Sequence, residues 1–230
     1  MITAGFRNAD GIAAGNSLVI PSSASISNID AGMICAWVMT TSTANTARNI
    51  CVKNASGTGG IEWVKRAADG TQLRFSKYRA TTAQTIDSPT GTLRANVPQF
   101  LALTWDINST ATHKMWVGAL DTPATMVTPT SVLGTGLPAS DLAVNLTIGN
   151  AGGAAQGWSG MIWMLAIGTK TDYTTDEIRR LQYRPSPFRG RAGLWIFDSV
   201  PAWDRAGNSA PGSLLGSGRL TADVLPRVSA

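Results

Sequence analysis

The sequence has few of the side chains that most catalytic and metal sites use. Its 230 residues include one histidine and two cysteines, too few for a tetrahedral zinc site. Glu62 and Glu177 are the only glutamates. Glycoside hydrolysis usually needs two carboxylates about 5–10 Å apart, but Glu62 stands alone in its predicted strand and Glu177 lies at a helix start. His113 is expected at a rim or on the surface. We therefore predict no catalytic residue and no enzyme.

Long apolar runs are also missing. No run approaches the ~20 residues that a transmembrane helix needs. The first residues, MITAGFRNADGIAAG, lack the charged start and apolar core of a signal peptide. We therefore expect synthesis in the cytoplasm without export, and no membrane partner. In that reducing compartment Cys35 and Cys51 should be free buried thiols, although a bond between neighbouring strands stays open as the alternative.

Charge is scarce. Charged residues make up 14% of the chain, whereas about a quarter is usual. Such a surface suits a protein packed against neighbours, but plain soluble β proteins share it. The net charge is +5, and a basic chain can bind nucleic acid. Because the lysines and arginines are scattered and form no dense block, we predict a mildly basic surface and no nucleic-acid partner.

Short apolar runs bounded by Ser, Asn and Gly predict strands. Leu73 and Phe75 alternate with polar residues from Gln72 to Ser76, the period of a half-buried antiparallel strand. Ala68–Gly70 supplies a tight turn before it, which predicts a hairpin. Many short strands separated by turn signals are typical of a sandwich or barrel. The predicted strands are Ser17–Pro21, Met33–Thr40, Asn49–Asn54, Gly60–Arg66, Thr71–Tyr78, Phe100–Asp106, His113–Gly118, Asn145–Gly149, Met161–Ile167 and Gly193–Ser199, with weaker ones near Leu214 and Leu220–Leu225.

One strand is expected to be central. Met161–Ile167 is apolar at every position, so both of its alternating faces should be covered. Strict alternation would place Trp163, Leu165 and Ile167 on one face. The glycine-rich stretch GNAGGAAQG before it is followed by a strand rather than a helix. It therefore lacks the helix start that a phosphate-binding loop needs, and we expect a hairpin loop.

A helix start follows the central strand. Thr174 and Glu177 have the spacing of a capping box, in which each side chain bonds the other residue's backbone N–H. The helix should run to about Tyr183 and end before Pro185, because the residue before a proline avoids helical geometry. It is expected to be the only substantial helix.

The order of these motifs resembles the concanavalin A-like lectin/glucanase superfamily, especially its laminin-G-like (pentraxin-like) branch. SLVIPSSASISNIDAGMICAWVMT is similar to that family's opening strands, and VPQFLALTWDINSTATHKMWVGAL to its central hairpin. NLTIGNAGGAAQGWSGMIWMLAIGTKTDYTTDEIRRL is similar to its strand-and-helix ending. GLWIFDSVPAWDRAGN resembles a segment that usually opens the domain, which suggests a permuted order. Over Ser17–Asn208, the resemblance implies an all-β fold: an antiparallel β-sandwich (jelly roll) with one short helix in the C-terminal half.

The domain boundary is expected near the end of that resemblance. We predict one laminin-G-like sandwich over residues 1–208. Residues 209–230 are loop-rich. They belong to the domain, or they form a C-terminal arm that packs on a neighbour.

The fold hosts lectins, glycosidases, adhesion modules and virion proteins, so it does not fix the function. The ending EIRRLQYRPSPF resembles proteins of tailed bacteriophages. That resemblance implies a structural protein of the virion, a capsid decoration (cement) or head accessory protein. Its partners would be the major capsid protein, other virion proteins or further copies of itself. The alternative is a carbohydrate-binding, receptor-recognition module of a tail fibre or spike, with a glycan as partner.

Two sets of residues are candidates for binding. Trp37, Trp105 and Trp163 lie inside apolar strands and should fill the core, whereas other tryptophans have polar neighbours and could stack on sugars or anchor an interface. Laminin-G-like domains hold calcium with loop oxygens, and calcium is the one cofactor that the resemblance leaves open. The aromatic candidates are Trp63, Trp116, Trp158 and Trp203, with core filling as the alternative. The calcium candidates are Asp106, Asn108, Asp198 and Asp204.

Overall fold

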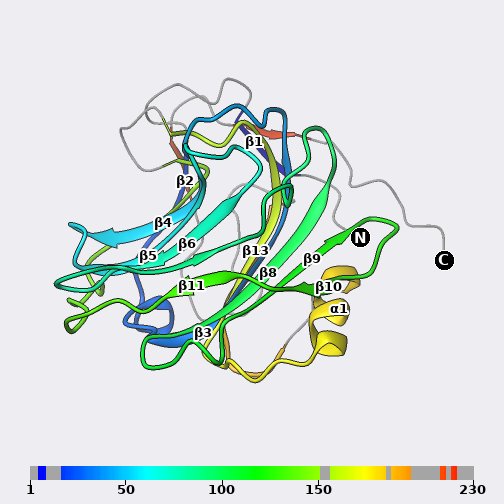
Figure 1. Ribbon diagram of the computed structural model, residues 1–230. Helices are drawn as coiled ribbons and strands as arrows, with labels where there is room; N and C mark the ends of the chain where they lie inside the picture. The colour runs from blue at the N-terminus through cyan, green and yellow to red at the C-terminus, as the bar shows by residue number, and fades with distance from the viewer. Residues whose placement is uncertain are drawn as a thin grey trace.

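The computed structural model describes residues 5–8, 17–150, 156–184, 188–197, 213–215 and 219–221. They form two antiparallel sheets packed face to face (Figure 1). In spatial order, sheet A contains β10 (Thr125–Val127), β9 (Lys114–Ala119), β8 (Gln99–Asp106), β3 (Ala31–Thr40), β13 (Gly160–Gly168), β1 (Gly5–Asn8) and β16 (Arg219–Thr221), and β14 (Arg191–Ile196) also pairs with β13. Sheet B contains β11 (Thr130–Val132), β7 (Gln84–Asp87), β6 (Leu73–Lys77), β5 (Gly59–Lys65), β4 (Arg48–Ala55), β12 (Leu146–Ile148), β2 (Ser17–Ile20) and β15 (Ser213–Leu215).

The predicted fold class is confirmed: the structure is an antiparallel β-sandwich. Its described part also contains a short 3-10 turn, η1 (Ala24–Ile26), and one α-helix, α1 (Thr175–Tyr183). No helix in these residues is long and apolar enough to cross a membrane. The strands β1, β7, β10 and β11 were not expected. Each has only three or four residues, which is too short to show a clear alternation.

Strand β13 occupies the predicted central position. It pairs with β3 along one edge and with β1 and β14 along the other, and all of its residues are buried. The predicted assignment of side chains to the two faces of this strand is partly wrong, because the register shifts between Ile162 and Met164. A bulge of this kind inserts an unpaired residue and breaks the alternation. Trp163 therefore packs on the outer side of sheet A, while Leu165 and Ile167 face sheet B.

Sheet A is covered on both faces. Its inner side chains meet those of sheet B in the main core. The helix α1 lies over its outer side (Figure 1). Tyr173, Ile178 and Leu181 are buried between them. The outer face of sheet B has no such cover among the described elements, and its side chains there are half-buried, as at Glu62, Arg74 and Thr85. Surfaces for ligands must therefore lie on sheet B, at the ends of the sandwich or along its edges.

The helix begins as predicted. The Thr174 hydroxyl accepts the backbone N–H of Glu177 at 3.2 Å, and the Glu177 carboxylate accepts that of Thr174 at 2.8 Å. Arg189 adds ion pairs to Glu177 at 2.8 Å and to Asp172 at 3.2 Å. The Thr174 N–H and the Arg189 guanidinium lower the pKa of Glu177 to about 2. The capping box and the ion pairs therefore join the helix start to the chain that follows the helix.

One further sequence interpretation needs correction. The stretch Gly149–Gly157 is not a hairpin loop, because β12 before it belongs to sheet B and β13 after it belongs to sheet A. Within residues 209–230, β15 pairs with β2 and β16 pairs with β1. The division of the chain into a domain and an arm stays a prediction. Cys35 and Cys51 are free and buried, which confirms the thiol interpretation.

A buried lysine closes one end of the sandwich. The Lys65 side chain is fully buried, and its ammonium donates to the carbonyls of Ser42 at 2.9 Å and Ala44 at 2.8 Å. Burial lowers the pKa of Lys65 to about 8. Lys53 and Lys77 are buried as well. The sequence contains a signal for the burial of two of these lysines. Lys65 lies two residues after Trp63 and Lys77 two residues after Phe75, so in a strand each lysine points to the same buried face as its aromatic neighbour.

The capping carboxylate should stabilise the fold only above the pH at which it protonates. Its folded pKa is depressed, so its contribution is present above about pH 4.5 and is lost as the pH falls toward 2. Glu177→Gln should lower the free energy of unfolding by about 1 kcal/mol at pH 7. Urea unfolding at several pH values should show the stability difference between wild type and variant narrowing below pH 4.5 and closing near pH 2. Asp176→Asn is the matched control. An equal pH-dependent loss in the control would contradict this assignment.

Lys65 should make the protein more stable at alkaline pH. Its unfolded pKa is near 10.5 and its folded pKa about 8, so the unfolded chain binds more protons between these values and stability rises with pH there. The full gain is about 3 kcal/mol. Lys65→Met should lack this gain when urea unfolding is compared at pH 7 and pH 10. Lys170→Met, at an exposed position, should retain it. A gain of the same size in Lys65→Met would refute the role of the buried ammonium.

Candidate functional site

Three of the four aromatic candidates are buried. Trp63, Trp116 and Trp158 are at most 1% exposed, so stacking on a ligand is wrong for them and the core-filling alternative holds. The polar edges of two of these rings have partners inside the protein. The Trp116 indole N–H donates to the Thr175 hydroxyl at 3.1 Å, and that of Trp158 donates to the Met39 carbonyl at 3.0 Å. Trp203 lies outside the described residues.

The calcium candidates are not brought together by the described part of the chain. Asp106 and Asn108 lie in the turn after β8, where the Asp106 carboxylate accepts the backbone N–H of Asn108 at 2.8 Å. Asp198 and Asp204 fall outside the described residues. Within those residues, no group of three or more His, Cys, Asp or Glu side chains could hold a metal ion. Calcium binding therefore stays a prediction.

The carboxylates on the outer face of sheet B already have partners. Glu62 accepts the Tyr78 hydroxyl, and burial together with this carboxylate raises the pKa of Tyr78. Asp87 accepts two hydrogen bonds from Arg74, both at 2.8 Å, and lies 3.4 Å from Arg66. Both carboxylates are therefore engaged by side chains of their own sheet.

His113 is buried rather than at a rim or on the surface, with 7% of its surface exposed. Its Nε2 lies 2.8 Å from the side-chain nitrogen of Gln84 and 3.1 Å from the carbonyl oxygen of Asp106. Burial lowers its pKa. No serine or cysteine is among these partners, so His113 does not form a nucleophile–base pair in the described structure.

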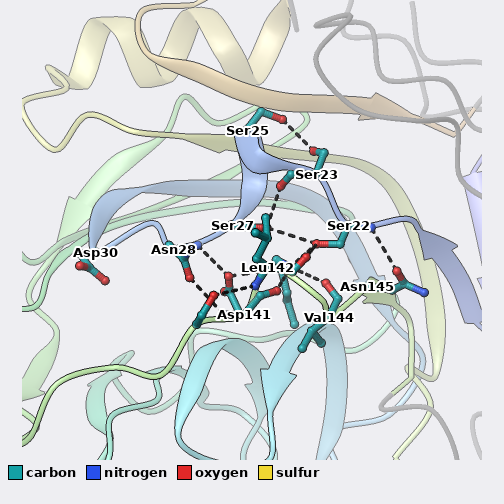
Figure 2. Close-up of polar contacts among 12 residues, drawn as sticks. Ser22, Ser23, Ser25, Ser27, Asn28, Asp30, Asp141, Leu142, Val144 and Asn145 are labelled. Atoms are coloured by element: carbon teal, nitrogen blue, oxygen red, sulfur yellow. Dashed lines mark hydrogen bonds and ion pairs between the residues drawn. The ribbon is translucent and has the colours of Figure 1, made fainter.

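A second polar cluster lies where the loops after β2 and before β12 meet (Figure 2). The Lys53 ammonium donates to the Ser22 hydroxyl at 3.1 Å and to the carbonyl of Asp141 at 2.7 Å. The Asp141 carboxylate accepts the Asn28 N–H at 2.7 Å, and the Asn28 side chain accepts the Asp141 N–H at 3.0 Å. Lys53 and Asp141 are buried, Ser22 is half-buried and Asn28 is exposed. Their hydrogen bonds join the two loops, so the structure assigns these groups a role in the fold.

A further candidate is a groove beside the edge of sheet A. It lies between the loop that follows β7 and the β9–β10 hairpin, and its volume is about 340 Å³. The hydroxyl-bearing residues among its walls are four threonines. Val117, Ala119 and Val127 supply apolar side chains to the same walls. We call it the threonine groove. Its lining residues are Pro89, Thr90, Gly91, Thr92, Arg94, Gln99, Val117, Gly118, Ala119, Thr122, Thr125 and Val127.

Buried hydrogen bonds hold the loop side of this groove. Gln99 is buried; its side chain accepts the Arg94 N–H at 2.8 Å and donates to the Thr92 carbonyl at 2.7 Å. Gly91 has a φ of 78°, a conformation that favours glycine, and its N–H donates to the Thr71 hydroxyl at 2.8 Å. The loop is thereby fixed from two sides.

The Arg94 side chain is the main free polar group of the groove. It is exposed, and its guanidinium has no hydrogen bond or ion pair within the described residues. Thr90, Thr122 and Thr125 are exposed beside it. This groove could not be predicted from the sequence, because Arg94 and Thr125 lie far apart in the chain and neither belongs to a motif.

No family model and no curated protein matches the sequence. Solved structures do match. A candidate carbohydrate-binding protein from Bacteroides ovatus has a TM-score of 0.64 at 12% identity, over 90% of this chain and 59% of that one. A SAP-like pentraxin from Limulus polyphemus has a TM-score of 0.51 at 14% identity, over 91% and 94%.

A third match is the enzymatically active domain of tailspike protein 2 from bacteriophage CBA120, with a TM-score of 0.51 at 15% identity, over 86% of this chain and 33% of that one. This chain therefore spans less than two thirds of the Bacteroides protein and of the tailspike domain. At such low identity the likenesses establish the fold alone. The chain shares the antiparallel β-sandwich fold of these proteins, which is the fold that the sequence resemblance implied.

Proposed function

We propose that the protein is a non-catalytic carbohydrate-binding module whose ligand occupies the threonine groove. The observation that carries this proposal is the lining of the groove: exposed threonines and a guanidinium without a partner among the described residues lie beside apolar side chains. The likeness to the candidate carbohydrate-binding protein of Bacteroides ovatus supports it.

The chemistry of the groove matches that of a sugar. A pyranose ring presents hydroxyls around its rim and C–H groups on its faces. Threonine hydroxyls both donate and accept, and a guanidinium donates in a planar fork. Val117 and Val127 can contact the apolar face of the ring. The volume of about 340 Å³ is at the small end of ligand pockets, which suits a short glycan segment. No aromatic ring is among the lining residues, so binding should be weak.

We propose binding rather than catalysis because the lining of the groove contains no side chain for acid–base chemistry. General acid–base catalysis needs a titratable side chain within hydrogen-bond reach of the reacting atoms. The lining residues include no Asp, Glu, His or Cys. The nearby sheet carboxylate of Asp87 is held by arginines.

A glycan array on the purified chain, followed by calorimetric titration of the best ligand, tests the proposal. Arg94→Ala should weaken binding at least tenfold, because it removes a charge-assisted hydrogen bond worth about 1.5–3 kcal/mol. Arg180→Ala removes the same charge at an exposed position of α1 and should leave binding unchanged. An array without any signal would overturn the carbohydrate function. Binding that survives Arg94→Ala would overturn the groove as its site.

A second function, that of a capsid decoration or head accessory protein in a phage virion, is favoured by a different observation. Most exposed large apolar side chains of the described chain gather between Met126 and Leu142, and such a group suits a protein partner. Imaging of particles would separate the two roles. A regular lattice on the head supports decoration, whereas a position at the tail tip supports receptor binding.

A further inference from the structure

One continuous segment forms the open margin of both sheets. Strand β10 is the last strand of sheet A and pairs only with β9, and β11 is the last strand of sheet B and pairs only with β7. Thr128 and Pro129 join them. Figure 1 shows β10 and β11 following one another along the same side of the sandwich. In the described structure, the other edge of each of these strands faces no strand.

This margin contains no charged residue of its own. Between Asp121 and Asp141 the sequence contains no Lys, Arg, Asp, Glu or His, and most of its residues are exposed. Two arginines contact it from outside: Arg79 donates to the Gly136 carbonyl at 2.6 Å and Arg179 to the Ala124 carbonyl at 3.0 Å. We call the segment Thr122–Ser140 the neutral edge. Soluble proteins usually protect a sheet edge with charged side chains, prolines or short strands. Here the short strands and Pro129 are present and the charges are missing.

Apolar side chains are concentrated on and beside the neutral edge. Met126 is 60% exposed, Val132 58% and Leu137 80%. Met126 lies opposite Trp116, on the outer side of sheet A, and Val132 lies opposite Thr85, on the outer side of sheet B. Apolar groups therefore flank the edge on both sides. Of the six large apolar side chains that are exposed in the described chain, five lie here or directly after it: Met126, Val132, Leu133, Leu137 and Leu142.

We propose that the neutral edge is the interface between two copies of this chain. A two-fold axis places the same segment of each copy against the other in opposite directions, which is the arrangement that antiparallel strand pairing needs. Each copy carries a net charge of +5, so most contacts between copies would oppose like charges. The neutral edge avoids that repulsion and buries the exposed apolar side chains of both copies.

The inference is independent of the carbohydrate function, but it has a consequence for the groove. Thr125 and Val127 belong both to β10 and to the lining of the threonine groove. A dimer through this edge would therefore hold two grooves close together. Two linked sites bind a repeating ligand more tightly than one, because the second contact is intramolecular.

Sedimentation analysis of the full chain from roughly 1 to 100 µM tests the proposal. The wild type should show a concentration-dependent dimer. Met126→Lys with Val132→Lys should raise the dissociation constant at least tenfold, because like charges would then meet across the axis. Both side chains are exposed, so the variant should fold, and its circular dichroism and melting curve should match the wild type.

Thr46→Lys is the control. Thr46 is exposed in the loop between β3 and β4, away from β10 and β11, and its substitution should leave the dimer intact. A wild type that stays monomeric at every concentration overturns the proposal and assigns the surface to a different protein. A dimer that survives both lysines, or that is lost in Thr46→Lys, overturns it as well.

Discussion

Burial of β13 on both of its faces constrains the rest of the molecule. The strand has no charged side chain and all of its residues are buried, so sheet A needs sheet B on one side and α1 on the other. Because burial of apolar surface contributes about 25 cal/mol per Å², this arrangement is a large part of what stabilises the fold. It also removes both faces of sheet A from contact with partners. The capping box of α1 and the Arg189 ion pairs then hold the cover in place.

The polar groups inside the sandwich have a structural role. Lys53 and Lys65 are far from solvent, yet their ammonium groups meet loop carbonyls at both ends of the main core. A buried charge is costly unless it is hydrogen-bonded, so each lysine fixes the loops that supply its acceptors. The threonine groove and the neutral edge differ from these clusters, because the Arg94 guanidinium and the apolar side chains of Met126 and Val132 are exposed to solvent. That difference is why we assign ligand and protein contacts to them.

The sequence predicted what local patterns determine. The alternation around Phe75, the apolar run of β13 and the spacing of Thr174 and Glu177 each specify a strand or helix start within a few residues, and the structure confirms them. Sequence patterns did not predict burial correctly where a residue is covered by an element distant in the chain. Trp116 has polar neighbours in sequence, but α1 covers it. Arg94 and Thr125 line the same groove although they belong to different loops and strands, and no local sequence pattern predicts that they lie close together.

Chemical-shift mapping of the labelled protein with a glycan that it binds tests the central claim most directly. The account predicts that the largest backbone shifts gather at Thr90, Thr92, Arg94 and Thr125, around the threonine groove. Shifts gathered instead around Glu62 and Tyr78 on the outer face of sheet B would contradict it, because they would move the binding surface to the other sheet.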